Sequence, residues 1–465
     1  MGCDHTFAPP GPSRGSCGVH VSSAGTNSVT AILTTVVSDP NSSVAPVVTT
    51  TFIRPLTDFL RKEASAGVLL VAAALAAIIW ANSPWSDSYV DLWGTEAIVG
   101  FGDWHLELSL QEWINDLAMV LFFFVAGLEI KREMTQGELR DPKAASLPII
   151  AALGGMVVPA AIFALLNAGG DGSKGWGIPM ATDIAIVTGV VVMLGSRAPS
   201  WMKLFLLALA IVDDIGAIIV IAIFYSEGVS FGWLATAIGS VVVAWSIRSR
   251  VPFVGAYLLL GAICWLALHN ANVHPTLAGV AFGIIAPVTP RRQTELVDAD
   301  DLAREPTVEN ARRVSIQAKE TVSVVEWLEY KLHPTAAFVV VPIFALANAG
   351  VHIPTDQIGD ALSSNVTWGV ILGLVVGKTI GITGFTLLAV ALKVGRLPAN
   401  VTKRYVLGAG ALGGIGFTVS LFVTELSFEG NASASTDARL GVLLGSLFAA
   451  LIGAAIVIPG RVGDD

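Results

Sequence analysis

The chain has 465 residues, of which 54% are hydrophobic and only 14% are charged. A soluble protein of this length needs far more charge to cover its surface, so the composition excludes the soluble globular class. The formal net charge is −9, and the 3 cysteines are too few and too scattered for a disulfide framework. Runs of about twenty apolar residues recur, and a helix of that length crosses a bilayer. None of these runs alternates as a membrane β-strand does, so the sequence predicts an all-α polytopic membrane protein.

The first 52 residues differ from the rest of the chain. They are rich in Ser, Thr, Pro, Gly and Val, and Arg14 is the single Lys or Arg among them. This composition predicts a disordered N-terminal tail over residues 1–52. Four residues in the tail could be zinc ligands, but their spacing fits no compact zinc-binding pattern, so we interpret them as ordinary tail residues. They are Cys3, His5, Cys17 and His20.

Twelve apolar segments follow, centred near residues 74, 121, 157, 187, 213, 238, 261, 281, 342, 377, 416 and 448. Lys and Arg are concentrated in the connections after the even-numbered segments, and only Lys174 and Arg439 lie in the others. Because basic loops stay in the cytoplasm, both termini are predicted to be cytoplasmic and the number of crossings to be even. Residues 53–465 are therefore predicted to form one twelve-helix domain. Its longest connection, residues 290–332, is predicted to be cytoplasmic, with a helix that runs into the ninth span.

Few ionisable residues remain at membrane depth once the connections are assigned. They are Asp116, Glu129, Asp183, Asp213, Asp214 and Lys378. Each costs roughly 2.5 to 3.5 kcal/mol at the middle of a bilayer, so such residues usually face an internal cavity and act in transport or coupling. The acids outnumber the single base, so ion pairing alone cannot neutralise all of them.

Asp213 and Asp214 are adjacent in an otherwise apolar run, LALAIVDDIGA. Neighbours on a helix point about 100° apart, so one carboxylate can line a cavity while the other reaches a neighbouring helix. Two close carboxylates also resist simultaneous ionisation, so their titrations should be coupled. Such a pair can exchange protons for a small cation. Hard carboxylate and carbonyl oxygens suit an alkali cation, and no Cys or His cluster indicates a transition metal.

Two glycine-rich stretches interrupt predicted spans. The fourth span contains GWGIPMATDIA, in which Gly175, Gly177 and Pro179 precede Thr182 and Asp183. The eleventh contains GAGALGGIGFT, whose glycines are Gly408, Gly410, Gly413, Gly414 and Gly416. Such interruptions in both halves of a transporter indicate broken helices with unwound centres around a site in the middle of the membrane.

The ends of the half-helices carry partial charges of about ±0.5 elementary charge. Where two broken helices cross, ends of the same sign face each other. Asp183 lies at one break and is placed to compensate the positive N-terminal ends. Lys378, in the stretch VVGKTIGIT, can compensate the negative C-terminal ends or pair with Asp213.

Seven motifs resemble those of the NhaA-type sodium/proton antiporters. They are GLEIKRE, ATDIA, LALAIVDDIGA, NVHPTLAG, LHPTAAFVVVPIFALANAGV, VVGKTIGI and GGIGFT, and the resemblance runs from about residue 56 to residue 460. It implies a transporter domain with about twelve spans, in which the third to fifth and the tenth to twelfth form an inverted repeat. The fourth and eleventh spans would be the two crossed, broken helices.

The resemblance also implies where the ions bind. Asp214 would bind the transported Na⁺ or Li⁺, with Asp213 in the same site, while Thr182 and Asp183 would contribute near the crossing. Lys378 would be the essential base. The unwound backbone would be that of Gly177, Pro179, Gly413, Gly414 and Gly416.

A pH-response region is implied by the same motifs. It would include Glu129, His274, Glu329 and His333. Each of the two histidines could instead be an interfacial or packing residue. The best-known members carry basic residues just before the Glu329 position, whereas Glu326 and Trp327 stand there in this chain. This difference bears on the pH set-point and not on the transport chemistry.

The resemblance thus implies a secondary active antiporter that exports Na⁺ or Li⁺ in exchange for entering protons and regulates intracellular pH and sodium. With more than one proton per cation, the exchange would be electrogenic. The protein is expected as a multi-pass protein of a prokaryotic plasma membrane. We expect it to need no cofactor and to bind no nucleic acid, and it could form a homodimer.

Two alternatives come from other classes, and a third lies within transport. An intramembrane aspartyl protease could use Asp183 and Asp214 as a dyad, but neither lies in a GxGD motif. A membrane prenyltransferase would hold Mg²⁺ with a DDxxD-like run, and the third acid is missing after Asp214. The protein is therefore not expected to be an enzyme. A proton- or sodium-coupled symporter of related fold for a small organic solute is the remaining alternative, although paired internal acids disfavour an organic anion.

Overall fold

The computed structural model describes residues 50–101, 104–226, 228–248, 254–288, 307, 322–352, 358–398 and 401–459. The chain divides into two units, Met1–Phe52 and Ile53–Asp465, and the second contains the helices considered below. The tail predicted over residues 1–52 lies outside the described residues except at its last positions. Most of the predicted connection 290–332 also lies outside them.

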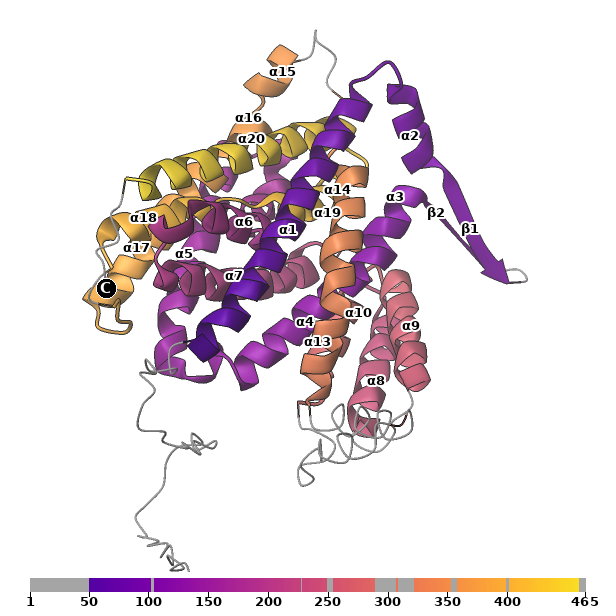
Figure 1. Cartoon of the computed structure of the whole chain (residues 1–465). Coiled ribbons are helices and arrows are strands. Elements are labelled where there is room, and N and C mark those ends of the chain that lie inside the picture. The colour runs from indigo at the N-terminus through magenta and orange to yellow at the C-terminus, as the bar shows by residue number, and fades with distance from the viewer. Residues whose placement is uncertain are drawn as a thin grey trace, which may run out of the picture. The chain divides into compact units, whose positions relative to one another are not determined.

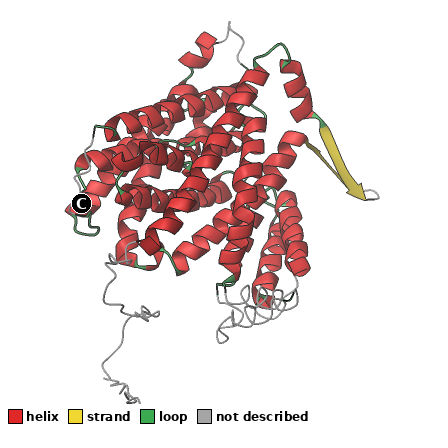
Figure 2. Cartoon of the chain, viewed as in Figure 1, coloured by secondary structure: helices red, strands yellow, loops and turns green. Residues whose placement is uncertain are grey.

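The described part of the second unit is built almost entirely of helices (Figure 2). The longer ones are α1 (Thr50–Ala81), α4 (Met119–Thr135), α5 (Pro142–Leu166), α7 (Ser200–Phe224), α8 (Phe231–Ile247), α9 (Val254–Asn270), α13 (Val324–Thr335), α17 (Lys378–Ala391) and α20 (Ala432–Val457). The shorter ones are α2 (Ser86–Gly94), α3 (Leu110–Trp113), α6 (Ile184–Leu194), α10 (Leu277–Ile285), α14 (Val341–Asn348), α15 (Ile358–Ser363), α16 (Asn365–Leu372), α18 (Lys403–Leu412) and α19 (Phe417–Ser427). π-helical turns join α3 to α4 (Ile114–Ala118), α13 to α14 (Ala336–Val340) and α16 to α17 (Gly373–Gly377, η7).

The helices coincide with the predicted spans. Among the described residues, seven helices are long and apolar enough to cross a membrane, or nine if each of two bent helix pairs is one span. The three remaining predicted spans are α8 and α9, with 17 residues each, and α10, with 9. Length and composition therefore support nine of the twelve predicted crossings. The count of twelve and the inverted repeat stay predictions.

A β-hairpin is among the elements absent from the sequence-based prediction. Strands β1 (Glu96–Phe101) and β2 (Trp104–Ser109) form an antiparallel hairpin in which Glu96 pairs with Ser109. Figure 1 shows the hairpin extending away from the helices. Ser109 ends β2 and also caps α3, because its hydroxyl accepts from the Glu112 N–H and the Glu112 carboxylate accepts from the Ser109 N–H. A local alternation of apolar and polar residues, HLELS, is the signal that could have predicted the second strand.

Small residues allow the helices around the middle of the bundle to approach closely. α5 and α17 meet where Gly381 faces Gly154, and a Cβ atom on Gly381 would lie 2.7 Å from the Gly154 carbonyl carbon. Membrane helices commonly pack through such small residues, because lipid supplies no hydrophobic force to drive them together. The close approach brings Lys378, one turn earlier on α17, against α5, where its side chain is fully buried.

Arg439 is one of the two basic residues that broke the predicted charge pattern. It lies on α20, and its guanidinium Nη2 and Nε are 2.5 and 2.8 Å from Glu425 Oε1 on α19. Both side chains are about four-fifths buried. The carboxylate therefore neutralises this exceptional arginine within the protein.

α1 contacts the helix formed by α13 and α14 at two places. At one end, Glu63 of α1 forms an ion pair with His333 of α13. At the other end, the Asn82 amide donates to the Val351 carbonyl oxygen over 2.8 Å. We call the end of the bundle that carries Lys131, Arg132, Arg140 and Lys143 the basic end. Because Arg132 pairs with Glu329 of α13, the Glu63–His333 contact also lies toward this end.

Candidate functional site

The first broken helix lies where Gly177 and Pro179 predict it. A 3₁₀ segment, Asp171–Met180 (η4), is followed by a short extended link and then by α6. The two helical parts are bent by 45°. Pro179 leaves helical geometry, with φ −82° and ψ 15°, and Ala181 is extended. Proline cannot donate to the helical hydrogen-bond ladder, which explains why the chain unwinds here.

The second broken helix consists of α18 and α19, bent by 46°. The link between them contains the predicted residues Gly413, Gly414 and Gly416. The links of the two broken helices contact each other directly. Thr182 Oγ1 lies 2.8 Å from the Gly413 carbonyl oxygen, and the Asp183 N–H donates to the Ile415 carbonyl oxygen over 2.6 Å. The prediction of two broken helices is therefore confirmed, and their unwound centres meet.

Asp183 caps the N-terminal ends of both half-helices. Its Oδ1 accepts from the Ile186 N–H of α6 over 3.1 Å. Its Oδ2 accepts from the Thr418 N–H of α19 over 3.0 Å and from the Thr418 hydroxyl over 2.7 Å. One carboxylate thus faces two positive helix ends, an arrangement that stabilises its charge. Both of its oxygens already accept hydrogen bonds within the protein.

Lys378 pairs with Asp213 beside Thr182, which lies in the link of the first broken helix. It follows the π-helical turn η7, and such turns inside a helix often occur at functional sites. Its Nζ lies 2.5 Å from Asp213 Oδ2 and 2.9 Å from Thr182 Oγ1. The Thr182 hydroxyl is in turn 2.7 Å from Asp213 Oδ2. The sequence left two roles open for Lys378, which were to compensate the C-terminal helix ends or to pair with Asp213. In the structure it pairs with Asp213.

Asp213 and Asp214 point to different surroundings, as their adjacency on one helix predicts. Asp213 reaches Lys378, whereas Asp214 lines a cavity of about 80 Å³. Oδ1 of each aspartate is buried and has no hydrogen-bond partner among the described residues. A buried oxygen without a partner is unfavourable, so these two atoms are suited to accept a proton or a cation.

The oxygens around Asp214 are of several kinds. Across the described part of the chain, no group of three or more His, Cys, Asp or Glu side chains could hold a metal ion. Thr182, Asp183 and Thr418 line the cavity together with Asp214. A cation at Asp214 would lie near hydroxyl and carboxylate oxygens, which are hard ligands that suit alkali cations.

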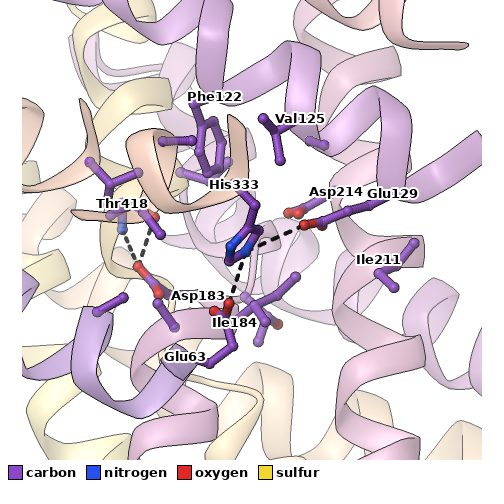
Figure 3. Close-up of a pocket in the computed structure, with 18 of the residues that line it drawn as sticks. Glu63, Phe122, Val125, Glu129, Asp183, Ile184, Ile211, Asp214, His333 and Thr418 are labelled. Carbon is purple, nitrogen blue, oxygen red and sulfur yellow. Dashed lines mark hydrogen bonds and ion pairs between the residues drawn. The ribbon is translucent and has the colours of Figure 1, made fainter. Parts of the chain in front are cut away.

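The cavity also contains ionisable side chains from helices outside the two breaks. Glu63 of α1, Glu129 of α4 and His333 of α13 lie on its wall (Figure 3). Arg132, at the basic end, also lines it. His333 Nε2 is 2.8 Å from Glu63 Oε1 and 3.7 Å from Glu129 Oε1. The imidazole thus lies between two carboxylates on different helices.

Three of the four residues implied for a pH response gather at the basic end. Glu129 and His333 line the cavity, and Glu329 forms an ion pair with Arg132. Arg132 also lies 3.5 Å from Glu133. The acids and bases of α4 and α13 therefore form one connected set of charges.

His274 lies apart from this set. It precedes α10, and its ring is 5.9 Å from the Phe422 ring of α19 in an edge-on contact. Its Nδ1 is buried without a hydrogen-bond partner among the described residues. None of its described contacts is with the other three residues implied for a pH response.

Two residues of the site were not assigned a role from the sequence. Thr418 was quoted within GGIGFT, and its place two residues after the last glycine of the break could have marked it as a helix N-terminal donor. Glu63 directly precedes the apolar run of α1, where an acid is ordinary at a membrane edge. Its contact with His333 joins segments far apart in the chain, so no local pattern could have predicted it.

A family model described as Na⁺/H⁺ antiporter 1 matches residues 57–457. The chain belongs to the Na⁺/H⁺ antiporter 1 family. Among related members, "Na(+)/H(+) antiporter NhaA 3" of Frankia alni is 45% identical over 405 residues, which cover 86% of this chain and 87% of the relative. "Na(+)/H(+) antiporter NhaA" of Rhodopirellula baltica is 42% identical over 422 residues, which cover 88% of this chain and 94% of the relative.

A solved structure also shows similarity to this member of the Na⁺/H⁺ antiporter 1 family. The sodium proton antiporter MjNhaP1 from Methanocaldococcus jannaschii, at pH 8, aligns with 89% of this chain and 100% of its own at 12% identity and a TM-score of 0.45. Membership of the family confirms the resemblance seen in the motifs and makes the chain a multi-pass membrane protein of a transporter family.

Proposed function

We propose that this protein exports Na⁺ or Li⁺ from a prokaryotic cell in exchange for entering protons. Both termini would be cytoplasmic, so the basic end of the helices would face the cytoplasm. The cation and the protons are substrates, and we expect no resident cofactor. The relatives whose names describe them as Na⁺/H⁺ antiporters support this assignment.

The observation that carries the proposal is the environment of Asp214. Its Oδ1 is buried without a hydrogen-bond partner among the described residues, and its side chain lines the cavity that contains Arg132 of the basic end. Asp213, on the same helix, is held by Lys378 and Thr182. One acid is thus accessible to a cation while its neighbour is part of a buried charge pair.

Exchange would follow from competition for these carboxylates. At alkaline cytoplasmic pH, Asp214 would be deprotonated and would bind the cation, with Asp213 in the same site. After the site reorients to the outside, the cation would leave, and protons would reload Asp214 and the buried pair of Asp213 and Lys378. Because proton and cation occupy the same oxygens, binding of one excludes the other, and no separate coupling device is required.

The cycle would be electrogenic if more than one proton enters for each cation. Each net positive charge that moves inward gains about 2.3 kcal/mol per 100 mV of inside-negative potential. The membrane potential would then drive cation export against a gradient. Lys378 would supply the second site of proton exchange, because its ammonium group carries a proton in direct contact with the Asp213 carboxylate.

Asp214→Asn tests the proposal. In sealed proteoliposomes containing the purified full-length protein, addition of Na⁺ or Li⁺ should move protons in the wild type and not in D214N. The matched control is Asp87→Asn on α2, an exposed position outside the cavity, which should exchange normally. Sodium-dependent proton movement in D214N at the wild-type rate would remove the assignment of Asp214 as the cation ligand.

A further inference from the structure

Glu63 is a buried acid that the exchange mechanism above does not use. It opens the apolar part of α1, and its side chain is only 5% exposed. It lines the cavity together with three other acids, Glu129, Asp183 and Asp214. Since α1 is also tied to the end of α14 through Asn82 and Val351, Glu63 is held in a fixed position against α13.

His333 is closer to Glu63 than to Glu129. Its Nε2 lies 2.8 Å from Glu63 Oε1 and 3.7 Å from Glu129 Oε1. The shorter contact is within ion-pair distance. Figure 3 shows the imidazole between these two carboxylates, and Asp214 lines the same cavity. The positive charge of a protonated His333 is therefore directed mainly to Glu63.

The other cation of this end is also engaged. Arg132 forms an ion pair with Glu329 and lies 3.5 Å from Glu133. Glu129 lines the cavity together with Asp214. Its nearest described cation is His333, and His333 lies closer to Glu63 than to Glu129. The charged groups that face His333 from the surrounding helices are Glu63 on α1, Glu129 and Arg132 on α4, Glu329 on α13, Asp183 at α6 and Asp214 on α7.

We propose that Glu63 is a positioning residue for cation access: it holds the His333 imidazolium and so keeps Glu129 available to bind the incoming cation before it reaches Asp214. This inference rests on the proposed exchange function. In it, Glu129 acts as an intermediate oxygen ligand between the basic end and Asp214. Glu63 acts only through His333.

Loss of the Glu63 charge would change the nearest partner of His333. The imidazolium of His333 would then have Glu129 as its nearest carboxylate partner on the cavity wall. A cation approaching Glu129 would have to displace that imidazolium, so the apparent affinity for the cation would fall. The reorientation of loaded Asp214 would not change, so the maximal rate would be preserved.

The experiment measures exchange as a function of Na⁺ concentration in proteoliposomes, across a pH series, for four proteins. They are wild type, Glu63→Gln, His333→Gln and the double variant. E63Q should raise the apparent KM for Na⁺ about tenfold at the acid end of the active range, the size of effect that a close opposite charge has on a carboxylate. The rise should shrink as pH increases and the imidazole loses its charge. The double variant should return to the KM of H333Q, because no imidazolium is left to bind Glu129.

The controls separate this role from general effects. Glu133→Gln removes an acid at the same end that does not line the cavity, and it should change the apparent KM much less than E63Q. Glu63→Asp shortens the side chain and weakens the same contact, so it should raise the KM mildly, again only when His333 is present. E63D supplies this test even where E63Q does not insert.

Two results would overturn the inference. One is a wild-type KM in E63Q and E63D at every pH, and the other is a double variant as impaired as E63Q. A wild-type protein that moves no protons on addition of Na⁺ would instead overturn the proposed function itself. The two failures are therefore distinguishable.

Discussion

Lys378 Nζ lies 2.5 Å from Asp213 Oδ2, and both side chains are fully buried. They come from two spans, α17 and α7, that are distant in the chain. Removal of one partner of such a pair leaves an uncompensated charge, which typically destabilises a protein by roughly 3–5 kcal/mol unless the remaining group becomes neutral. The pair is therefore a structural contact, and in the proposed mechanism it would also exchange a proton.

Lys378→Gln should retain sodium-dependent exchange but make it electroneutral. The variant loses a group that can carry a proton, and Asp213 can stay protonated in the absence of its cationic partner, so folding is preserved. Currents on solid-supported membranes, compared with proton movement in the same vesicles, measure the charge moved per exchange. Lys403→Gln, at an exposed position at the start of α18, should keep the wild-type ratio. An unchanged ratio in K378Q together with a large loss of thermal stability would assign Lys378 to charge neutralisation instead.

Asp183→Asn should lower the thermal stability of the protein, and Na⁺ should still stabilise the variant. The carboxylate caps the N-terminal ends of α6 and α19, and loss of a cap costs about 1–2 kcal/mol for each helix end. Because both Asp183 oxygens already accept hydrogen bonds, a direct cation contact is secondary. Thermal unfolding of the purified protein in detergent, with and without Na⁺, measures both the loss of stability and the response to the cation.

The control for Asp183 is Thr418→Val. It removes the hydroxyl donor to Asp183 Oδ2 but keeps the Thr418 N–H, so its effect should be about half as large. A variant D183N with normal thermal stability and no response to Na⁺ would make Asp183 a cation ligand rather than a helix cap.

The residues of the site could be predicted where a residue type disagrees with its immediate neighbours in the sequence. Asp213 and Asp214 interrupt an apolar run, and Gly177 and Pro179 interrupt a helix, so both features can be recognised from a few neighbours. The unwound backbone at Pro179 and the divergent directions of the two aspartates then follow from peptide geometry. These are the features that the structure reproduces.

Glu63 and the hairpin of β1 and β2 show where prediction from the sequence ends. Glu63 becomes functional only through His333, and nothing near either residue indicates that α1 will contact α13. The hairpin is short and lies between two helices, in a stretch that the sequence-based prediction assigned to a loop. That prediction did not use the alternation of apolar and polar residues in β2. Tertiary contacts between distant segments, rather than local preferences, decide both cases.

Glu425→Arg should reduce thermal stability, and the exchange of both charges should restore most of it. The ion pair with Arg439 joins α19 to α20 at partly buried positions, so reversal of one charge places two cations together. We expect a loss of about 1–3 kcal/mol for the single change, above the range of an exposed pair. The double variant E425R/R439E, measured by thermal unfolding, should be close to the wild type. Equal losses in the single and double variants would show that packing, and not charge, holds these helices together.

Tyr225→Phe should destabilise the segment before the first break. The Tyr225 hydroxyl, at the end of α7, accepts from the Gly177 N–H over 3.1 Å and donates to the Lys174 carbonyl oxygen over 2.9 Å. Loss of the hydroxyl leaves both backbone groups without this partner, at a cost of roughly 1–3 kcal/mol. Burial raises the pKa of Tyr225, so the phenol stays neutral and the loss should be the same at neutral and alkaline pH.

Gly177→Ala provides the partner measurement for Tyr225. A Cβ atom at Gly177 would lie 2.7 Å from the Tyr225 hydroxyl oxygen, so the alanine must displace the hydroxyl that binds its own N–H. Each single change therefore breaks the same contact, and the double variant G177A/Y225F should lose clearly less stability than the sum of the two losses. Thermal unfolding of the four proteins gives the coupling directly. Strict additivity would mean that the hydroxyl and the glycine act independently, and that the end of α7 does not fix the position of the first break.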